Sequence, residues 1–190
     1  RQGIIYLPED RHLHGCFLDG SIKENISSSA LYRLFKIFIR PRVEVDLAKS
    51  YINTLNILTT GYDNPAKFLS GGNQQKIVLA REIERNPDLL LIGQPTRGVD
   101  IGAIEFIHQQ IVALRDAGKA LLLVSVELEE IMGLSDRIAV MFDGKIAQVA
   151  TPQMLYGKPC SRRVGNFIGM MNFLEAKILG TQGDKVEVDV

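Results

Sequence analysis

The sequence predicts an α/β protein, and two observations carry that prediction. Short apolar runs at residues 3–7, 88–93 and 120–125 have the length and composition of buried strands. Helix-patterned stretches come directly before the second and the third of these runs, at about 73–85 and 102–116. Strand–helix–strand alternation with apolar strands indicates a parallel sheet that is covered on both faces.

Composition narrows the class of protein. Hydrophobic residues make up 46% of the 190 residues, and 22 basic side chains balance 22 acidic ones. This balance argues against a broad nucleic-acid-binding surface, so we expect no nucleic-acid partner. Cys16 and Cys160 lack metal-binding spacing and indicate a reduced, cytoplasmic setting. No apolar run approaches the roughly 20 residues that span a bilayer, and we interpret the start at Arg1 as a truncation.

The segment from residue 20 to residue 68 is predicted to be all-helical. Ser21 and Glu24 have the spacing of a capping box. Apolar residues recur at helical spacing between Val45 and Leu55, after a break at Pro41. An apolar run precedes that break and fits a docking surface and internal packing equally well: Leu31, Tyr32, Leu34, Phe35, Ile37, Phe38 and Ile39.

The C-terminal part is predicted to mix short helices and strands. A helix is expected near residues 127–133, and strands at 137–142 and 145–149 flank the hairpin signal Asp143-Gly144. A helical passage at 161–168 and alternating residues at 185–190 complete the chain.

The string with the strongest chemical content is Leu69-Ser70-Gly71-Gly72-Asn73-Gln74-Gln75-Lys76. Two glycines let backbone amides approach a phosphate without a Cβ in the way. The helix that follows directs its positive end to the same place, and the Ser70 hydroxyl adds a donor. Taken alone, the string also fits a glycine-rich turn with a serine cap.

This string resembles the signature motif of ATP-binding cassette (ABC) proteins, in the form found in simple-sugar and nucleoside importers. Residues 87–100 resemble the Walker B strand and D-loop of that family, residues 124–130 its switch-histidine segment, and residues 6–15 its Q-loop. The four motifs occur in order between residue 1 and about residue 150. The resemblance implies a partial P-loop NTPase core, residues 1–150, with an inserted helical subdomain at 20–68.

The tail resembles a different branch of the family. Residues 151–174 are similar to the linker of oligosaccharide-importer ATPases, which leads into a regulatory β-barrel. Residues 151–190 would then be a linker and a short C-terminal β stub. We interpret the chain as a mosaic that is truncated at both ends.

The resemblance also implies how the chain acts. Two cassettes enclose two ATP molecules, each between the phosphate loop of one cassette and the signature of the other. The chain would bind ATP and Mg²⁺ only through such a partner, beside permease subunits on the cytoplasmic face of the membrane. Asp100 matches the D-loop aspartate. The residues expected to contact the partner's ATP are Leu69, Ser70, Gly71, Gly72, Asn73 and Gln74.

Other positions depart from the family pattern. No Gly-x-x-x-x-Gly-Lys-[Ser/Thr] loop occurs in the chain. Gly93 and Gln94 stand where the Walker B strand carries Asp-Glu, and neither can act as a general base. Val126 occupies the switch-histidine position, and Glu9 the Q-loop glutamine position. We expect the chain to be deficient in hydrolysis, with no metal site of its own.

Two other functions remain open at this point. One is a soluble ABC ATPase that acts on DNA or ribosomes, and the other is an inactive gene remnant. The pair His12 and His14 is expected in a solvated loop, and His108 on the surface of its helix. Because the phosphate-loop strand normally lies inside the sheet, we also predict that this chain exposes apolar strand surface.

Overall fold

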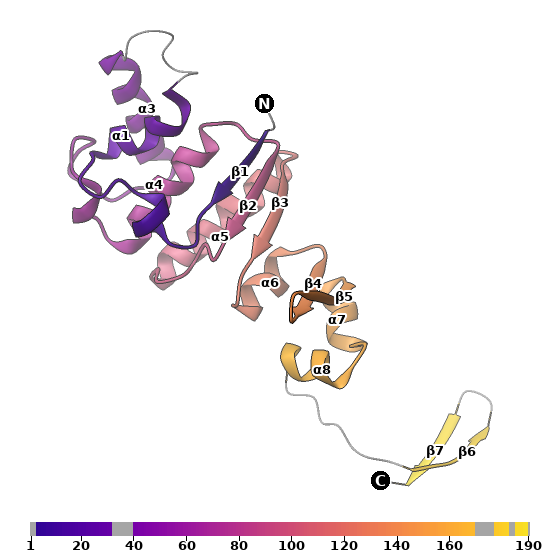
Figure 1. Cartoon of the computed structure of the whole chain (residues 1–190). Helices are drawn as coiled ribbons and strands as arrows, with labels where there is room; N and C mark the ends of the chain where they lie inside the picture. Colours follow the sequence, from indigo (N-terminus) through magenta and orange to yellow (C-terminus); the bar gives the residue numbers. More distant parts are fainter. Residues whose placement is uncertain (1–2, 32–39, 170–176, 183–184, 190) are drawn as a thin grey trace. The chain divides into compact units, whose positions relative to one another are not determined.

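A computed structural model of the chain describes residues 3–31, 40–169, 177–182 and 185–189. It contains two compact units, Arg1–Leu134 and Ser135–Val190, which are described separately here (Figure 1). Most of the apolar run considered for docking, residues 32–39, lies outside the described residues. The boundary at residue 150, drawn from the resemblance, stays a prediction.

The first unit is built on a parallel sheet of three strands in the order β1-β2-β3. The strands are β1 (Ile4–Leu7), β2 (Leu89–Gly93) and β3 (Ala120–Val124). Ile4 pairs with Leu89, and Leu89 pairs with Ala120, so the three strands run in register from their first residues. The predicted parallel sheet is therefore confirmed, within one residue at most strand ends.

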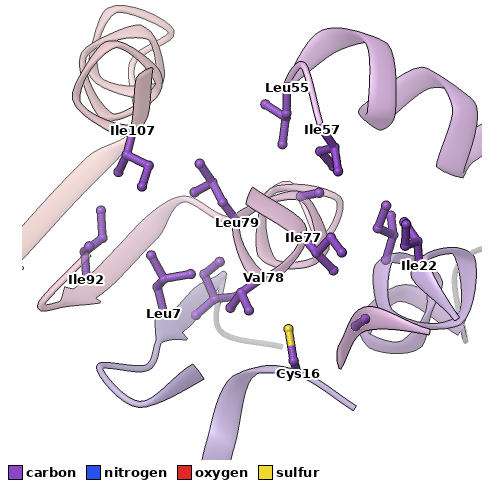
Figure 2. Close-up of a cluster of buried hydrophobic side chains, with 14 of the residues drawn as sticks. Leu7, Cys16, Ile22, Leu55, Ile57, Ile77, Val78, Leu79, Ile92 and Ile107 are labelled. Atoms are coloured by element: carbon purple, nitrogen blue, oxygen red, sulfur yellow. The ribbon is translucent and has the colours of Figure 1, made fainter. Parts of the chain in front are cut away.

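Two long helices pack on one face of this sheet, α4 (Gly71–Ile83) and α5 (Ile101–Asp116). Figure 2 shows Leu7 and Ile92 directed toward α4, with Ile107 of α5 beside Ile92. We call this the closed face, and its most deeply buried strand residues are Ile5, Leu7, Leu90 and Ile92, each no more than 4% exposed. Burial of apolar side chains here supplies the main stabilisation of the unit.

The other face of the sheet is apolar but open. The strand register places eight side-chain positions on it: Ile4, Tyr6, Leu89, Leu91, Gly93, Ala120, Leu122 and Val124. Leu122 is 56% exposed and Val124 is 60% exposed. The prediction of exposed apolar strand surface is confirmed, whereas the expectation of a sheet covered on both faces is wrong for these described residues.

The segment from residue 20 to residue 68 is helical over much of its described length, but residues 55–65 form turns and irregular backbone, so the expectation of an all-helical segment is wrong there. It contains α1 (Ile22–Ser27), the 3₁₀ turns η2 (Ser28–Ala30) and η3 (Ala66–Phe68), and α3 (Pro41–Thr54). The capping box at α1 is confirmed, since Ser21 and Glu24 bond reciprocally. Pro41 begins α3, at the position where its missing N–H has no consequence.

A helix from the first unit and a hairpin from the second match the remaining predictions. The helix is α6 (Leu128–Leu134), and the hairpin joins β4 (Ile138–Phe142) to β5 (Lys145–Ala150). Asp143 has φ of 52° and Gly144 has φ of 74°, as a type I′ turn requires.

The second unit continues with α7 (Pro152–Gly157), α8 (Arg162–Ile168) and the hairpin of β6 (Lys177–Gln182) with β7 (Lys185–Asp189). Helix α7 was not predicted, although Thr151 and Pro152 form a standard helix start. Phe167 of α8 packs edge-on against Phe142, with ring centroids 5.6 Å apart. In the part of the chain that the structure describes, no helix is long and apolar enough to cross a bilayer.

Candidate functional site

Helix α4 begins at a corner formed by exposed Ser70, partly buried Gly71 and buried Gly72, which we call the signature corner. Ser70 is the N-cap, and its Oγ accepts hydrogen bonds from the Asn73 amide at 3.4 Å and from Asn73 Nδ2 at 2.9 Å. The Ser70 hydroxyl therefore keeps its own proton available for an acceptor outside the chain. The first amides of a helix have no intrahelical acceptors, and they carry the positive end of its dipole.

The two glycines of the corner are also required by packing, which the sequence did not reveal. A Cβ on Gly71 would lie 2.6 Å from Arg11 Nη2 and 2.9 Å from the Gly98 carbonyl oxygen. A Cβ on Gly72 would lie 2.7 Å from Ala103 Cβ and 2.8 Å from Asp100 Oδ2. The corner is thus held against the start of α5, so a larger residue would separate the two helices.

The next two residues of the string, Asn73 and Gln74, direct their side chains into the protein. Asn73 is 9% exposed, and its Oδ1 accepts from the Leu58 amide at 2.8 Å. Gln74 is 5% exposed; its Nε2 donates to the Ala66 carbonyl, and its Oε1 lies 2.9 Å from His12 Nε2. These side chains hold the corner in place from behind.

Asp100 lies directly beside the corner. Its Oδ1 accepts from the Ala103 amide at 3.0 Å and so caps α5. Its other oxygen faces Gly72. A carboxylate that caps one helix and borders the N-terminus of another is suited to link the two.

The four positions that depart from the family pattern lie at one edge of the sheet. Glu9, Gly93 with Gln94, and Val126 each follow or end a strand, and the carboxyl ends of parallel strands meet at a common edge. A Cβ on Gly93 would be 3.5 Å from the Glu9 amide nitrogen. Val126 is 76% exposed. This edge contains no carboxylate from the end of β2.

Gln94 has an unusual backbone conformation. Its φ is 46°, in the left-handed region that few non-glycine residues adopt. The conformation is fixed by two hydrogen bonds, from the Gln94 amide to the Val124 carbonyl at 2.8 Å and from the Arg97 amide to the Gln94 carbonyl at 3.2 Å. Backbone strain of this kind is common at functional positions.

Burial changes the pKa of two ionisable groups along α4. Lys76 is 8% exposed, donates to the Asn56 carbonyl and sits 4.4 Å from the centroid of the Phe106 ring. Burial lowers the pKa of the Lys76 ammonium. Burial also raises the pKa of the Cys16 thiol to about 11, although Arg81 and Arg11 nearby oppose the change.

Sequence reasoning missed two residues of the site and one pair beside it. Arg11 and Gly98 lie against the corner, and only the presence of Arg11 in the Q-loop-like string could have drawn attention to it. His108 is not simply a surface residue, because its Nε2 lies 2.9 Å from Oε1 of the buried Glu130. This pair joins α5 to α6, just after the switch position.

The described residues fit one part of a bound nucleotide and not another. A phosphate oxygen suits the signature corner, which offers a hydroxyl, unpaired helix amides and no Cβ at Gly71. A magnesium ion is not held by the end of β2, because Gly93 and Gln94 supply no carboxylate there. The residues at the end of β2 therefore support no metal-dependent step on this chain.

Comparisons with known proteins were made by sequence and by fold. No family model matches the sequence. The chain is 50% identical over 154 residues to the guanosine import ATP-binding protein NupO of Bacillus subtilis (strain 168), and 43% identical over 155 residues to the nucleoside import ATP-binding protein NupA of Lactococcus lactis subsp. cremoris (strain MG1363). Each match covers 80% of this chain but only 30% and 31% of those proteins.

A ribose import ATP-binding protein, RbsA 2 of Rubrobacter xylanophilus, is 42% identical over 147 residues, 77% of this chain and 28% of its own length. The chain thus spans about a third of the length of the curated relatives it matches.

The solved structures agree on the fold. A nucleotide-free ATP-binding cassette of an ABC transporter superposes with a TM-score of 0.67 at 21% identity, covering 89% of this chain and 69% of that one. A second cassette, in its ADP conformation, gives a TM-score of 0.65 over 87% of this chain and 67% of that one. The chain therefore has the α/β fold of an ABC ATPase over part of a cassette's length, and its sequence is of the type found in the ATP-binding proteins of nucleoside and ribose importers.

Proposed function

We propose that this chain is a cassette portion of a nucleoside or sugar importer and that it offers its signature corner to ATP held by a second cassette. The observation that carries the proposal is the start of α4, where Ser70 is exposed and its hydroxyl oxygen accepts from Asn73, which leaves the hydroxyl proton for an outside acceptor. Relatives named as nucleoside and ribose import ATP-binding proteins support it. In this role the chain would bind permease subunits as a peripheral protein on the cytoplasmic face of the membrane.

Each residue of the signature string has its own part in this proposal. Ser70, Gly71 and Gly72 contact the phosphate, while Leu69, Asn73 and Gln74 support them from the protein side. Asp100 borders Gly72 and transmits the state of one ATP site to the other. Magnesium would reach the site only with the nucleotide of the second cassette.

We further propose that the chain does not hydrolyse ATP by itself. Gly93 has no side chain to hold a metal, and the Gln94 amide cannot accept a proton from water at neutral pH. Val126 cannot donate a hydrogen bond to a phosphate. Turnover would therefore need the catalytic groups of a second cassette.

ATP turnover in a mixed system tests both statements. The second protein is an intact cassette with its own phosphate loop and Walker B carboxylates, in which the serine of its own signature is replaced so that it cannot activate itself. We expect no turnover from either protein alone and clear turnover from the mixture. Turnover by this chain alone, or an inactive mixture, would overturn the corresponding half of the proposal.

Two substitutions at Ser70 make the test specific. Ser70→Asp and Ser70→Thr both keep a side chain that can cap α4, so the fold should persist. Ser70→Asp adds a negative charge beside the phosphate and should abolish the turnover of the mixture, whereas Ser70→Thr should retain most of it. Equal activity of the two variants would remove the corner from the ATP site. Co-purification with nucleic acid would favour the alternative of a soluble ABC ATPase, and a chain that is never expressed would favour a gene remnant.

A further inference from the structure

Arg11 is the residue that joins the signature corner to the turn leading into α5. It opens a short π-helical turn, η1 (Arg11–Gly15), whose N-cap is Asp10. The Asp10 carboxylate accepts from the amides of His12 at 2.9 Å and Leu13 at 3.0 Å. The backbone of Arg11 is therefore fixed by a local structure of its own.

The segment that carries Arg11 is also fastened along α4. His12 Nε2 lies 2.9 Å from Gln74 Oε1, and Cys16 Sγ lies 3.7 Å from the Gln74 carbonyl oxygen. Two turns further along the helix, Arg81 donates to the Gly15 carbonyl. The backbone segment that carries Arg11 is thus attached to α4.

The guanidinium group of Arg11 reaches from this base to the opposite segment. Nη1 donates to the Arg97 carbonyl at 2.8 Å, Nη2 to the Gly98 carbonyl at 3.2 Å, and Nε to Gln74 Oε1 at 3.4 Å. Among the described residues, no other donor reaches either of the two carbonyls. A planar fork with donors on three nitrogens matches these acceptors, and a single ammonium group cannot.

The turn that Arg11 holds needs such a contact. Arg97 and Gly98 are exposed, and Gly98 adopts the left-handed φ of 64°. The Gly98 carbonyl oxygen lies only 2.9 Å from the place where a Cβ of Gly71 would be. Any shift of the turn therefore changes the space directly in front of the corner, and with it the position of Asp100.

We propose that Arg11 is a positioning residue that fixes the distance between the signature corner and residues 97–100. Its consequence for ATP rests on the function proposed above, but its structural part does not. With Arg11 in place, a phosphate at the corner meets Gly71, Gly72 and Asp100 in one fixed arrangement. Without it, the turn is free to move while α4 and the sheet remain folded.

Hydrogen exchange on the full 190-residue chain tests the structural part. In Arg11→Gln and in Arg11→Lys we expect amide exchange in the peptide 97–103 to rise about tenfold or more, because two carbonyls lose their donors. Exchange in the interior of α5, residues 107–114, should not change, which also verifies that the variants fold. Arg115→Gln, at an exposed arginine of α5 that pairs with the neighbouring Asp116, is the matched control.

The Lys variant separates geometry from charge. If Arg11→Lys exchanges like the wild type, a positive charge is sufficient and the fork is not required, which overturns the proposal. Unchanged exchange in Arg11→Gln would overturn it as well. Faster exchange over the whole of unit 1 would show that Arg11 only stabilises the fold, and this too would contradict a positioning role.

ATP turnover in the mixed system then tests the functional part. We expect Arg11→Gln to lower kcat about tenfold or more with little change in KM, since the second cassette holds the nucleotide itself. A kcat equal to that of the wild type would overturn the functional part. If the wild-type chain gives no turnover at all, the function proposed above fails, while the exchange experiment still decides whether Arg11 positions the turn.

Discussion

The two faces of the parallel sheet consist of the same kinds of residue but have opposite surroundings. On the closed face, Leu90 is fully buried and Ile92 is 1% exposed beneath α4 and α5. Leu122 and Val124 of β3 point to the open face, because they pair with the residues that follow Leu90 and Ile92 in β2. Both are more than half exposed. Apolar composition alone therefore does not tell which strand residues are buried.

The described residues therefore provide a covering layer of helices on one face of the sheet and none on the other. Parallel sheets are found almost only with helices on both faces. The helices α4 and α5 cover one face, and they also carry the signature corner and Asp100. The site thus lies on the covering layer that this chain does contain, and four predictions examine that asymmetry.

The largest effect is expected in the core of the closed face. Leu90→Ala should lower the free energy of unfolding by about 2–5 kcal/mol, because it removes fully buried contacts and leaves a cavity. Leu122→Ala, the same change on the open face, should lower it by no more than about 0.5 kcal/mol. Urea unfolding followed by circular dichroism measures both, and similar losses would mean that the two faces are not different.

A pH-dependent effect is expected from Cys16, which packs in the core behind the closed face. Because its pKa in the native state is about 11, against an ordinary value of 9.0, the native state holds the thiol proton more tightly than the unfolded chain. This stabilisation is complete below about pH 9 and is lost as the pH rises toward 11, in total on the order of 2–3 kcal/mol.

The comparison of wild type with Cys16→Ala isolates this term from the other groups that titrate in alkaline solution. The wild type should lose more stability than the variant between pH 9 and pH 11. Cys160 is exposed and serves as the control, since Cys160→Ala should follow the wild type. Parallel pH profiles for all three proteins would contradict the expected burial of the Cys16 thiol.

A smaller effect is expected where the covering helix α5 begins. Asp100→Ala removes the side chain that caps α5, which should cost about 0.5–2 kcal/mol. Asp100→Asn keeps a capping oxygen and should be nearly neutral. Thermal unfolding distinguishes the two, and equal destabilisation by both variants would assign the loss to the carboxylate charge and not to the cap.

The smallest effect on stability belongs to the open face, where a different measurement is more informative. Leu122→Lys should change the free energy of unfolding by less than about 0.5 kcal/mol, because Leu122 already contacts water. It should, however, reduce the binding of a hydrophobic dye and any self-association of the chain. A wild-type chain that is monomeric and binds no dye would show that the open face is covered in solution.

Much of the fold could be predicted because it depends on short-range patterns. The capping box at Ser21 and the type I′ turn at Asp143-Gly144 are specified within a few residues. The strands follow from continuous apolar runs. Helix α7 had an equally local signal in Thr151-Pro152 and was missed, so that error came from the interpretation and not from the physics.

The sequence by itself determined the kind of structure and which residue types stand at the candidate site. It placed Ser70, Gly71 and Gly72 at a helix start, and it established that Gly93 and Gln94 supply no carboxylate. These conclusions hold in any arrangement of the elements, since they depend only on residue type and local spacing.

Only the tertiary structure decided which apolar residues are buried and what the corner touches. Arg11 meets Gly98 across 87 positions of sequence, and Gly72 meets Asp100 only because α4 and α5 pack closely. Such contacts depend on how whole elements come together on one face of a sheet. No local pattern encodes that geometry, and for this reason the role of Arg11 could not be inferred before the fold was known.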